Sequence, residues 1–407
     1  MAKPSPAPLA LRYAAGQFEF PVHHMRGGTS TGLVLWEGLM PASQLLREEL
    51  LRHLMGVPLT GELHGNRQIT GLGRGTATSN KVFLARVEEV NGQRRIVSTL
   101  AQLAAGHGRI DWSVNCGNMS SSLLLWALDA GMITGQVEAD IANTNTGVVT
   151  TARMQVSPHG HYAVAEIPGV DGAYPRVDLF LHDPMGSKTG RMLPTGRASD
   201  EVAGCTVSCV DVAVPMVIAN AVDFGKTAHE STAELEGDAE FIRQFRHVWI
   251  EAALRMGLRN KDGVIMGRED IALSETLPKA CIIGRPKNGG HLAVRYFTPQ
   301  TVHASMAVSG GCCLAAAALI PGTVANHIAQ GVPTVLPQFS DLGIGIENPA
   351  GILETVMDAR MTNDLLEIRR AAYRRNTQIL LRGYTPIYRA SDALLEALDT
   401  IYVSQKK

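Results

Sequence analysis

Two short glycine turns hold the residue types in this chain that could do chemistry. Residues 115–118 (NCGN) precede an apolar helix predicted at 123–130, and residues 309–311 (SGG) precede a small-residue helix predicted at 312–320. A helix begins with unpaired N–H groups and a partial positive charge, and glycine lets an anion approach that backbone. Two such helix ends could grip a dicarboxylate or a tricarboxylate. The plainer alternative is that the glycines only make tight turns.

One thiol and one amine accompany these loops. Cys116 lies in the first turn, and a thiol at a helix N-terminus ionises more readily, which suits proton transfer. Lys81 follows a polar, glycine-rich loop over 68–80 and opens a strand. Each residue also has a structural interpretation. A buried cysteine acts as a small hydrophobic residue, and on spacing alone Lys81 is a surface lysine that starts a strand.

The elements around these residues fall into two similar halves. A helix is predicted over 41–55, where leucines recur at helical spacing and Gly56 ends the pattern. Asn91-Gly92 predicts a hairpin after the Lys81 strand, and residues 287–290 predict a second one. Each half therefore offers a strand, a glycine turn and a buried helix. The amino-acid sequences of the two halves match poorly, so the repeat is one of architecture and not of sequence.

Composition excludes several classes of protein. The 407 residues suggest about two domains. With 37 basic and 38 acidic residues, the formal charge of −1 argues against disorder and against nucleic-acid binding. The sequence contains no run of 18 apolar residues and no apolar stretch at its N-terminus, so we expect neither a membrane span nor a signal peptide. A reduced, cytoplasmic protein with 41 glycines is the simplest interpretation.

Two kinds of bound group are also unexpected. Cys205 and Cys209 have no second pair and no nearby histidine, so a zinc site is not predicted. The GLGRG loop at 71–75 does not follow the strand–turn–helix pattern of a nucleotide site. We therefore predict neither a metal nor a cofactor.

Six motifs together resemble those of the 2-methylaconitate isomerase and 4-oxalomesaconate tautomerase family. They are RGGTS (26–30), SNK (79–81), NCGN (115–118), LPTG (193–196), LRMGL (254–258) and HASMAVSGG (303–311). The resemblance runs from about residue 18 to about residue 390. It implies the α+β fold of diaminopimelate epimerase, in which two similar halves each wrap a mostly antiparallel sheet around a central helix, with the active site in the cleft between them.

The resemblance also sets the expected organisation of the chain. We expect the halves at 18–200 and 201–390, with tails at 1–17 and 391–407. Whether the C-terminal end packs back on the first half stays open. A homodimer is implied by the resemblance alone, and the expected partner is a small-molecule carboxylate rather than nucleic acid or membrane.

The implied reaction is a cofactor-free allylic proton shift. A carbon acid loses a proton at one end of a C=C–C unit and gains one at the other end, through a dienolate. The resemblance assigns Lys81 as the base and Cys116 as the partner that delivers a proton or steadies the dienolate. Asn80 is expected to orient Lys81. The residues expected to bind substrate are Arg26, Gly27, Gly28, Thr29, Ser30, Asn80, Gly117, Asn118, His303, Ser309 and Gly310.

A two-thiol racemase is disfavoured. The epimerase relatives use two opposed cysteines, and alignment on Gly310 places Ala307 at the second position. Cys312 and Cys313 lie further along the predicted helix, where packing is their expected role. The loss of the second cysteine, together with Lys81, separates an isomerase from an epimerase.

Within the family, the chain is more similar to the 4-oxalomesaconate tautomerase branch, which implies a keto–enol or 1,3-proton shift in aromatic-acid catabolism. The stretches behind this are 205–230, 277–290, 295–305 and 346–351. The alternatives are a 2-methylaconitate or methylitaconate isomerase and a non-catalytic carboxylic-acid-binding protein. Thr31, Asn348 and Gln378 stand where the family or branch usually has Lys, His and Arg, although Arg375 remains. Each replaced side chain could have bound a carboxylate or oxo group of the substrate, so the replacements can change which acid the protein accepts.

Overall fold

The chain folds into two compact units. The computed structural model describes residues 9–157, 160–260, 262–363 and 365–406. Unit 1 comprises Met1–Glu166, Val170–Leu179 and Arg375–Lys407, and unit 2 comprises Ile167–Gly169 and Phe180–Arg374.

These units differ from the division predicted at residue 200. The reason is the long strand β19 (Leu365–Pro386), which pairs with β18 in unit 2 and then with β2 in unit 1. The chain therefore returns to unit 1 for its last segment. No helix in the part of the chain that the structure describes is long and apolar enough to cross a bilayer.

Unit 1 is a mixed sheet in which hairpins are joined by parallel crossovers. The pairings β2–β3, β4–β5 and β7–β8 are antiparallel, whereas β3–β4 and β5–β7 are parallel. The strands are β1 (Arg12–Ala14), β2 (Gln17–Gly27), β3 (Ser30–Trp36), β4 (Lys81–Val90), β5 (Gln93–Ala104), β6 (His107–Asp111), β7 (Glu138–Asn143), β8 (Val149–Met154), β9 (Val164–Ile167) and β10 (Val170–His182), the last of which runs on into unit 2.

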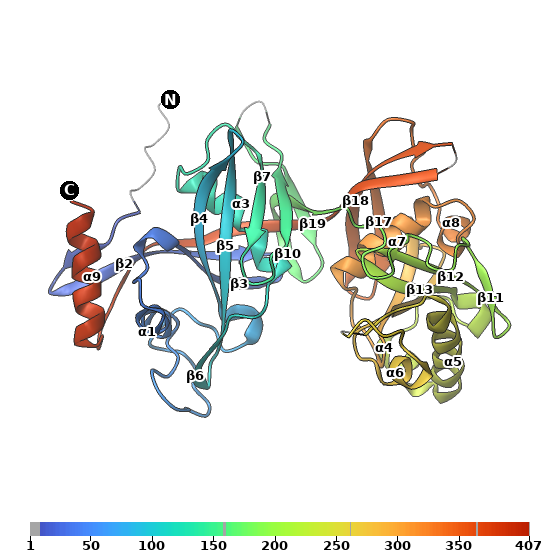
Figure 1. Cartoon of the computed structure of the whole chain (residues 1–407), viewed down its shortest axis with the longest axis horizontal. Helices are drawn as coiled ribbons and strands as arrows, with labels where there is room; N and C mark the ends of the chain where they lie inside the picture. Colours follow the sequence, from blue (N-terminus) through green and yellow to red (C-terminus); the bar gives the residue numbers. More distant parts are fainter. Residues whose placement is uncertain (1–8, 158–159, 261, 364, 407) are drawn as a thin grey trace. The chain divides into compact units, whose positions relative to one another are not determined.

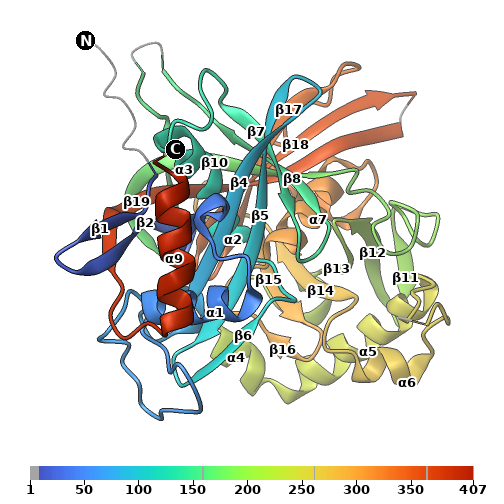
Figure 2. The same ribbon diagram turned by 60° about the vertical axis from the view of Figure 1, so that its left-hand side comes forward.

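The helices of unit 1 cover the two faces of this sheet. The apolar helix α3 (Leu123–Asp129) packs on β5, β7 and β8, and Figure 1 shows it beside β7. The other face carries α1 (Gln44–Met55) and α9 (Asp392–Ser404), which lie side by side (Figure 2). Leucines of β3, α1 and α9 share one buried core on that face. Within the segment 391–407, expected as a tail, Asp392–Ser404 thus forms the helix α9, whose Leu394 and Leu398 are fully buried.

Unit 2 repeats the same alternation of strands. The pairings β12–β13, β14–β15 and β17–β18 are antiparallel, and β13–β14 and β15–β17 are parallel. The strands are β11 (Asp200–Val202), β12 (Cys205–Val212), β13 (Val214–Asn220), β14 (Lys279–Gly284), β15 (Leu292–Thr298), β16 (Thr301–Val302), β17 (Ser340–Asn348) and β18 (Gly351–Thr362). The predicted repeat of architecture is therefore present strand by strand, and the α+β fold class is confirmed.

The helices of unit 2 also divide between the two faces. The small-residue helix α7 (Val308–Leu319) packs on β12, β13, β17 and β18, as Figure 1 shows. The opposite face is covered by α5 (Ala239–Arg255), whose Phe241, Phe245 and Trp249 enter the core. The remaining helices are α4 (Thr232–Gly237), α6 (Arg268–Leu273) and α8 (Val324–Ile328).

The first predicted helix starts at Leu123 as expected, as α3, and a short helix α2 (Gly117–Ser120) precedes it. The second helix begins at Val308, four residues before the predicted start. Ser309–Gly311 therefore forms the first turn of α7 instead of a turn before it. The glycines there are packing residues, since a Cβ on Gly310 would lie 2.5 Å from the Tyr296 ring and one on Gly311 would collide with Leu353.

Candidate active site

The RGGTS segment forms the tip of the β2–β3 hairpin and packs against the start of α2. Gly27 pairs with Ser30, and Gly28 adopts a left-handed conformation with φ of 53°. A Cβ on Gly27 would lie 2.5 Å from the Asn118 carbonyl oxygen, closer than real Cβ atoms come. Only glycine therefore lets this hairpin approach the α2 backbone so closely.

Cys116 is the N-cap of α2. Its Sγ accepts from the Met119 N–H at 3.5 Å and lies 3.9 Å from Ser30 Oγ. The Cys116 N–H donates to Asn115 Oδ1 at 2.7 Å, which fixes the turn. A partly exposed sulfur that receives a backbone N–H is suited to carry negative charge as a thiolate.

Asn118 connects the hairpin tip with β19. Its Nδ2 donates to Thr29 Oγ1 at 3.1 Å, and its Oδ1 accepts from Arg375 Nε at 2.8 Å. The arrangement brings the guanidinium of Arg375 to the loop that holds Cys116. Two predicted binding residues, Thr29 and Asn118, are thus joined by a single hydrogen bond.

Lys81 is the first residue of β4, and its side chain is largely buried, with 7% exposed. Its Nζ donates to the Ala77 carbonyl and to Gln102 Oε1, each at 2.6 Å. The sequence analysis missed Gln102, although a signal was available. Counting back ten residues on each side of the Asn91-Gly92 turn pairs Lys81 with Gln102, as the structure has it.

The register of the strands places Lys81 and Cys116 on the same face of the sheet. Gly32 pairs with Lys81 across the parallel β3–β4 ladder, and Ser30, which contacts Cys116, is two residues earlier on the same face. From strand spacing and rise, the Cα atoms of Ser30 and Lys81 are about 8 Å apart. The Lys81 side chain and the residue that contacts Cys116 thus project from the same part of the sheet face.

Asn80 lies away from this face. Its side chain is fully buried, and its Oδ1 accepts from Gln68 Nε2 at 2.7 Å. The Asn80 side chain is therefore bonded to Gln68, and the amide side chain held against Lys81 is that of Gln102. The roles predicted for Asn80 remain predictions.

Arg26 also projects from the other face, where its cross-strand neighbours are Thr31 and Gln378. Its Nη1 donates to Asn376 Oδ1 at 2.6 Å and its Nε donates to Gln378 Oε1 at 3.2 Å, while Nη2 has no hydrogen-bond partner among the described residues. Burial lowers the pKa of this guanidinium from its ordinary value. Its hydrogen-bonding neighbours Asn376 and Gln378 are neutral, and the guanidinium carbon lies 4.6 Å from the centre of the Tyr174 ring. Its predicted contact with a substrate carboxylate stays a prediction.

The remaining predicted residues lie in unit 2. His303 Nδ1 accepts from the Ser305 N–H at 2.9 Å, and its ring packs edge-on against Tyr296 at 5.7 Å. Ser309 and Gly310 are in the first turn of α7, where Gly310 touches the same tyrosine. Burial raises the pKa of Tyr296, whose hydroxyl has no partner among the described residues.

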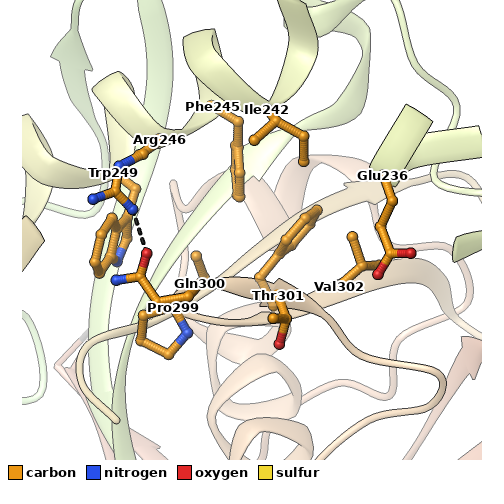
Figure 3. Close-up of a pocket in the computed structure, with 11 residues that line it drawn as sticks. Glu236, Ile242, Phe245, Arg246, Trp249, Pro299, Gln300, Thr301 and Val302 are labelled. Carbon is orange, nitrogen blue, oxygen red and sulfur yellow. Dashed lines mark hydrogen bonds between the residues drawn. The ribbon is translucent and has the colours of Figure 1, made fainter. Parts of the chain in front are cut away.

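Unit 2 also contains a pocket of about 210 Å³ between α5 and the β15–β16 turn (Figure 3). Its apolar wall includes Phe245, Trp249 and Phe297, and Arg246 at the rim donates to the Gln300 side chain. None of the predicted site residues lines this pocket. Within the ranges described, no three His, Cys, Asp or Glu side chains are grouped to hold a metal ion.

Comparison with known proteins places the chain in a family. Residues 17–388 match the family described as PrpF protein. The chain is 31% identical over 344 residues to the "Putative isomerase YbhH" of Escherichia coli (strain K12), covering 83% of this chain and 90% of that protein. It is 30% identical over 330 residues to a 4-oxalomesaconate tautomerase of Pseudomonas putida, covering 77% and 84%.

A solved structure confirms the fold. The crystal structure of a methylitaconate-delta-isomerase superposes with a TM-score of 0.74 at 24% identity, covering 94% of this chain and 97% of that one. The family match spans most of the chain, and the relatives are named isomerases. The chain therefore belongs to the PrpF protein family, and it is an isomerase.

Proposed function

We propose that this isomerase shifts a proton and a C=C bond within an unsaturated di- or tricarboxylate, and that 4-oxalomesaconate is its substrate. The observation that carries the reaction type is the placement of Lys81. Its amine is nearly buried, is held by two neutral oxygen acceptors, and shares a sheet face with the Cys116 thiol. The substrate assignment is supported by the likeness to the Pseudomonas putida tautomerase.

In the proposed mechanism Lys81 acts in its uncharged form. Its lone pair takes a proton from the allylic carbon, and the C–H electron pair becomes part of a dienolate. The Cys116 thiol gives its proton to the far carbon, which moves the double bond. Lys81 is then an ammonium and Cys116 a thiolate that the Met119 N–H stabilises. Solvent returns one proton to sulfur and takes one from nitrogen before the next turnover.

The negative charge of the dienolate needs fixed positive partners. Arg375, tied to Asn118 beside the Cys116 loop, is the guanidinium in unit 1 placed to serve. This arrangement favours a substrate with more than one carboxylate.

The test is isomerisation in D₂O followed by proton NMR, with 4-oxalomesaconate, 2-methylaconitate and methylitaconate as candidate substrates. We expect deuterium uptake and double-bond movement with 4-oxalomesaconate, and loss of both in Lys81→Met and Cys116→Ala. The exposed Lys188→Met is the matched control. If another acid of the panel is the one converted, the substrate assignment fails. If Lys81→Met keeps the wild-type rate, the mechanism fails.

A further inference from the structure

We infer that Gln102 is a positioning residue that presents the Lys81 amine as a base, an inference that rests on the proposed role of Lys81. Gln102 lies on β5 directly opposite Lys81. Its Oε1 and the Ala77 carbonyl each accept from Nζ at 2.6 Å.

Two acceptors account for two of the directions around the Lys81 nitrogen, in the uncharged amine and in the ammonium alike. An uncharged lysine amine has two N–H bonds and one lone pair, whereas the ammonium has three N–H bonds. Two acceptors occupy the two N–H bonds, so the lone pair points away from both. In the ammonium, the third N–H takes that same direction. The proton is therefore gained and lost along one line while the nitrogen stays in place.

The amide of Gln102 is itself held in one orientation. Its Nε2 lies within 3.1 Å of the carbonyl oxygens of Ala77, Asn80 and Leu103. A flipped amide would turn its oxygen toward these three carbonyls and its NH₂ group toward the amine. The contact of that oxygen with three other oxygens would be repulsive, so Oε1 is fixed on Lys81.

Charged groups near this pair are few. The residues of the neighbouring strand β3 on this face are Ser30 and Gly32, and the turn before β4 is the uncharged Ala77–Ser79 segment. Asp111 of β6 pairs with Gln102 on the far side of β5, where the Ser113 N–H and hydroxyl lower the pKa of its carboxyl. Cys116 is the titratable group on α2. A carboxylate introduced at position 102 would thus be the anion directly bonded to the amine.

The experiment compares Gln102→Glu and Gln102→Met with wild type, in the full-length protein. Gln93→Glu adds the same charge at an exposed position at the start of the same strand and is the matched control. The readouts are the pH profile of kcat/KM, kcat and KM separately, and an NMR titration of ¹³Cε-labelled lysines in which Lys81→Met identifies the Lys81 signal.

We expect Gln102→Glu to move the acid limb of the profile, and the titration of the Lys81 signal, to higher pH by about 1–3 units, because an opposite charge favours the ammonium. Gln102→Met should lower kcat by roughly 10- to 100-fold through a misplaced amine, with KM within about twofold. Gln93→Glu should match wild type. If Gln102→Glu does not fold, Gln102→Met carries the test.

An unchanged Lys81 titration in Gln102→Glu, or an unchanged kcat in Gln102→Met, would overturn the inference. Failure of the proposed function looks different. In that case Lys81→Met retains isomerase activity, while the NMR titration still reports whether position 102 controls the amine.

Discussion

Gly27→Ala tests whether the hairpin tip and the Cys116 turn form one rigid assembly. The added Cβ would lie 2.5 Å from the Asn118 carbonyl oxygen and 3.0 Å from the Met119 Cα. Ordinary contact begins near 3.4 Å, so the hairpin and α2 must separate by close to 1 Å. Overpacking of this kind destabilises a folded protein by about 1–3 kcal/mol. A shift of about 1 Å in a reacting group can lower the rate by roughly 100-fold.

The assay is urea unfolding together with isomerase kinetics on the same preparation. We expect Gly27→Ala to lose about 1–3 kcal/mol of unfolding free energy and to lower kcat by 10- to 100-fold. Gly383→Ala is the matched control, because Gly383 also lies in a strand of unit 1 and its Cβ would meet open space. Wild-type activity in Gly27→Ala, or equal damage in Gly383→Ala, would refute the reasoning.

Three further predictions concern stability. Burial and Arg74 lower the pKa of His24 from 6.5 to about 4. The unfolding free energy should therefore be complete above pH 6.5 and fall by about 3 kcal/mol as the pH drops toward 4. Urea titrations at several pH values should show this slope, and His24→Gln should reduce it. Asp211→Asn should lower the unfolding free energy by about 2–4 kcal/mol, because the buried carboxylate accepts from the Lys188 and Thr189 N–H groups at 2.8 Å. An unchanged midpoint of urea unfolding would contradict this. Leu398→Ala should cost about 2–5 kcal/mol through a cavity under α9, measured the same way, and a loss below 1 kcal/mol would show that α9 is dispensable.

Local sequence signals predicted those parts of the fold that depend on short-range geometry. The helix expected at 41–55 is α1, because its leucines recur at the helical period and Gly56 closes it in the left-handed conformation. Asn91-Gly92 makes the predicted two-residue turn, with positive φ at both residues. The repeat of architecture was visible because each half needs the same order of strand, turn and buried helix.

Features decided by contacts between distant residues were not predicted. Within the first turn of α7, Gly310 lies so close to the Tyr296 ring that a Cβ would not fit, and no local pattern encodes this contact. The opposite orientations of Arg26 and Lys81 follow from the register of the β2–β3 and β3–β4 pairs, which join segments far apart in the chain. The helix α9 packs its Leu394 and Leu398 on an apolar surface formed by α1 and β3, which lie far away in the sequence. The predicted roles of the site residues await the experiments above.

The path of β19 has a consequence for the order in which the chain folds. Gly27 pairs with Thr377, so the first unit to be synthesised lacks a central strand until the ribosome has nearly finished. Unit 2 is contiguous from Phe180 to Arg374, apart from a three-residue contribution. Pairing over such a separation is slow to form. The second half of the chain can therefore fold first, and the unit that holds Lys81 and Cys116 is completed only when the C-terminal segment emerges.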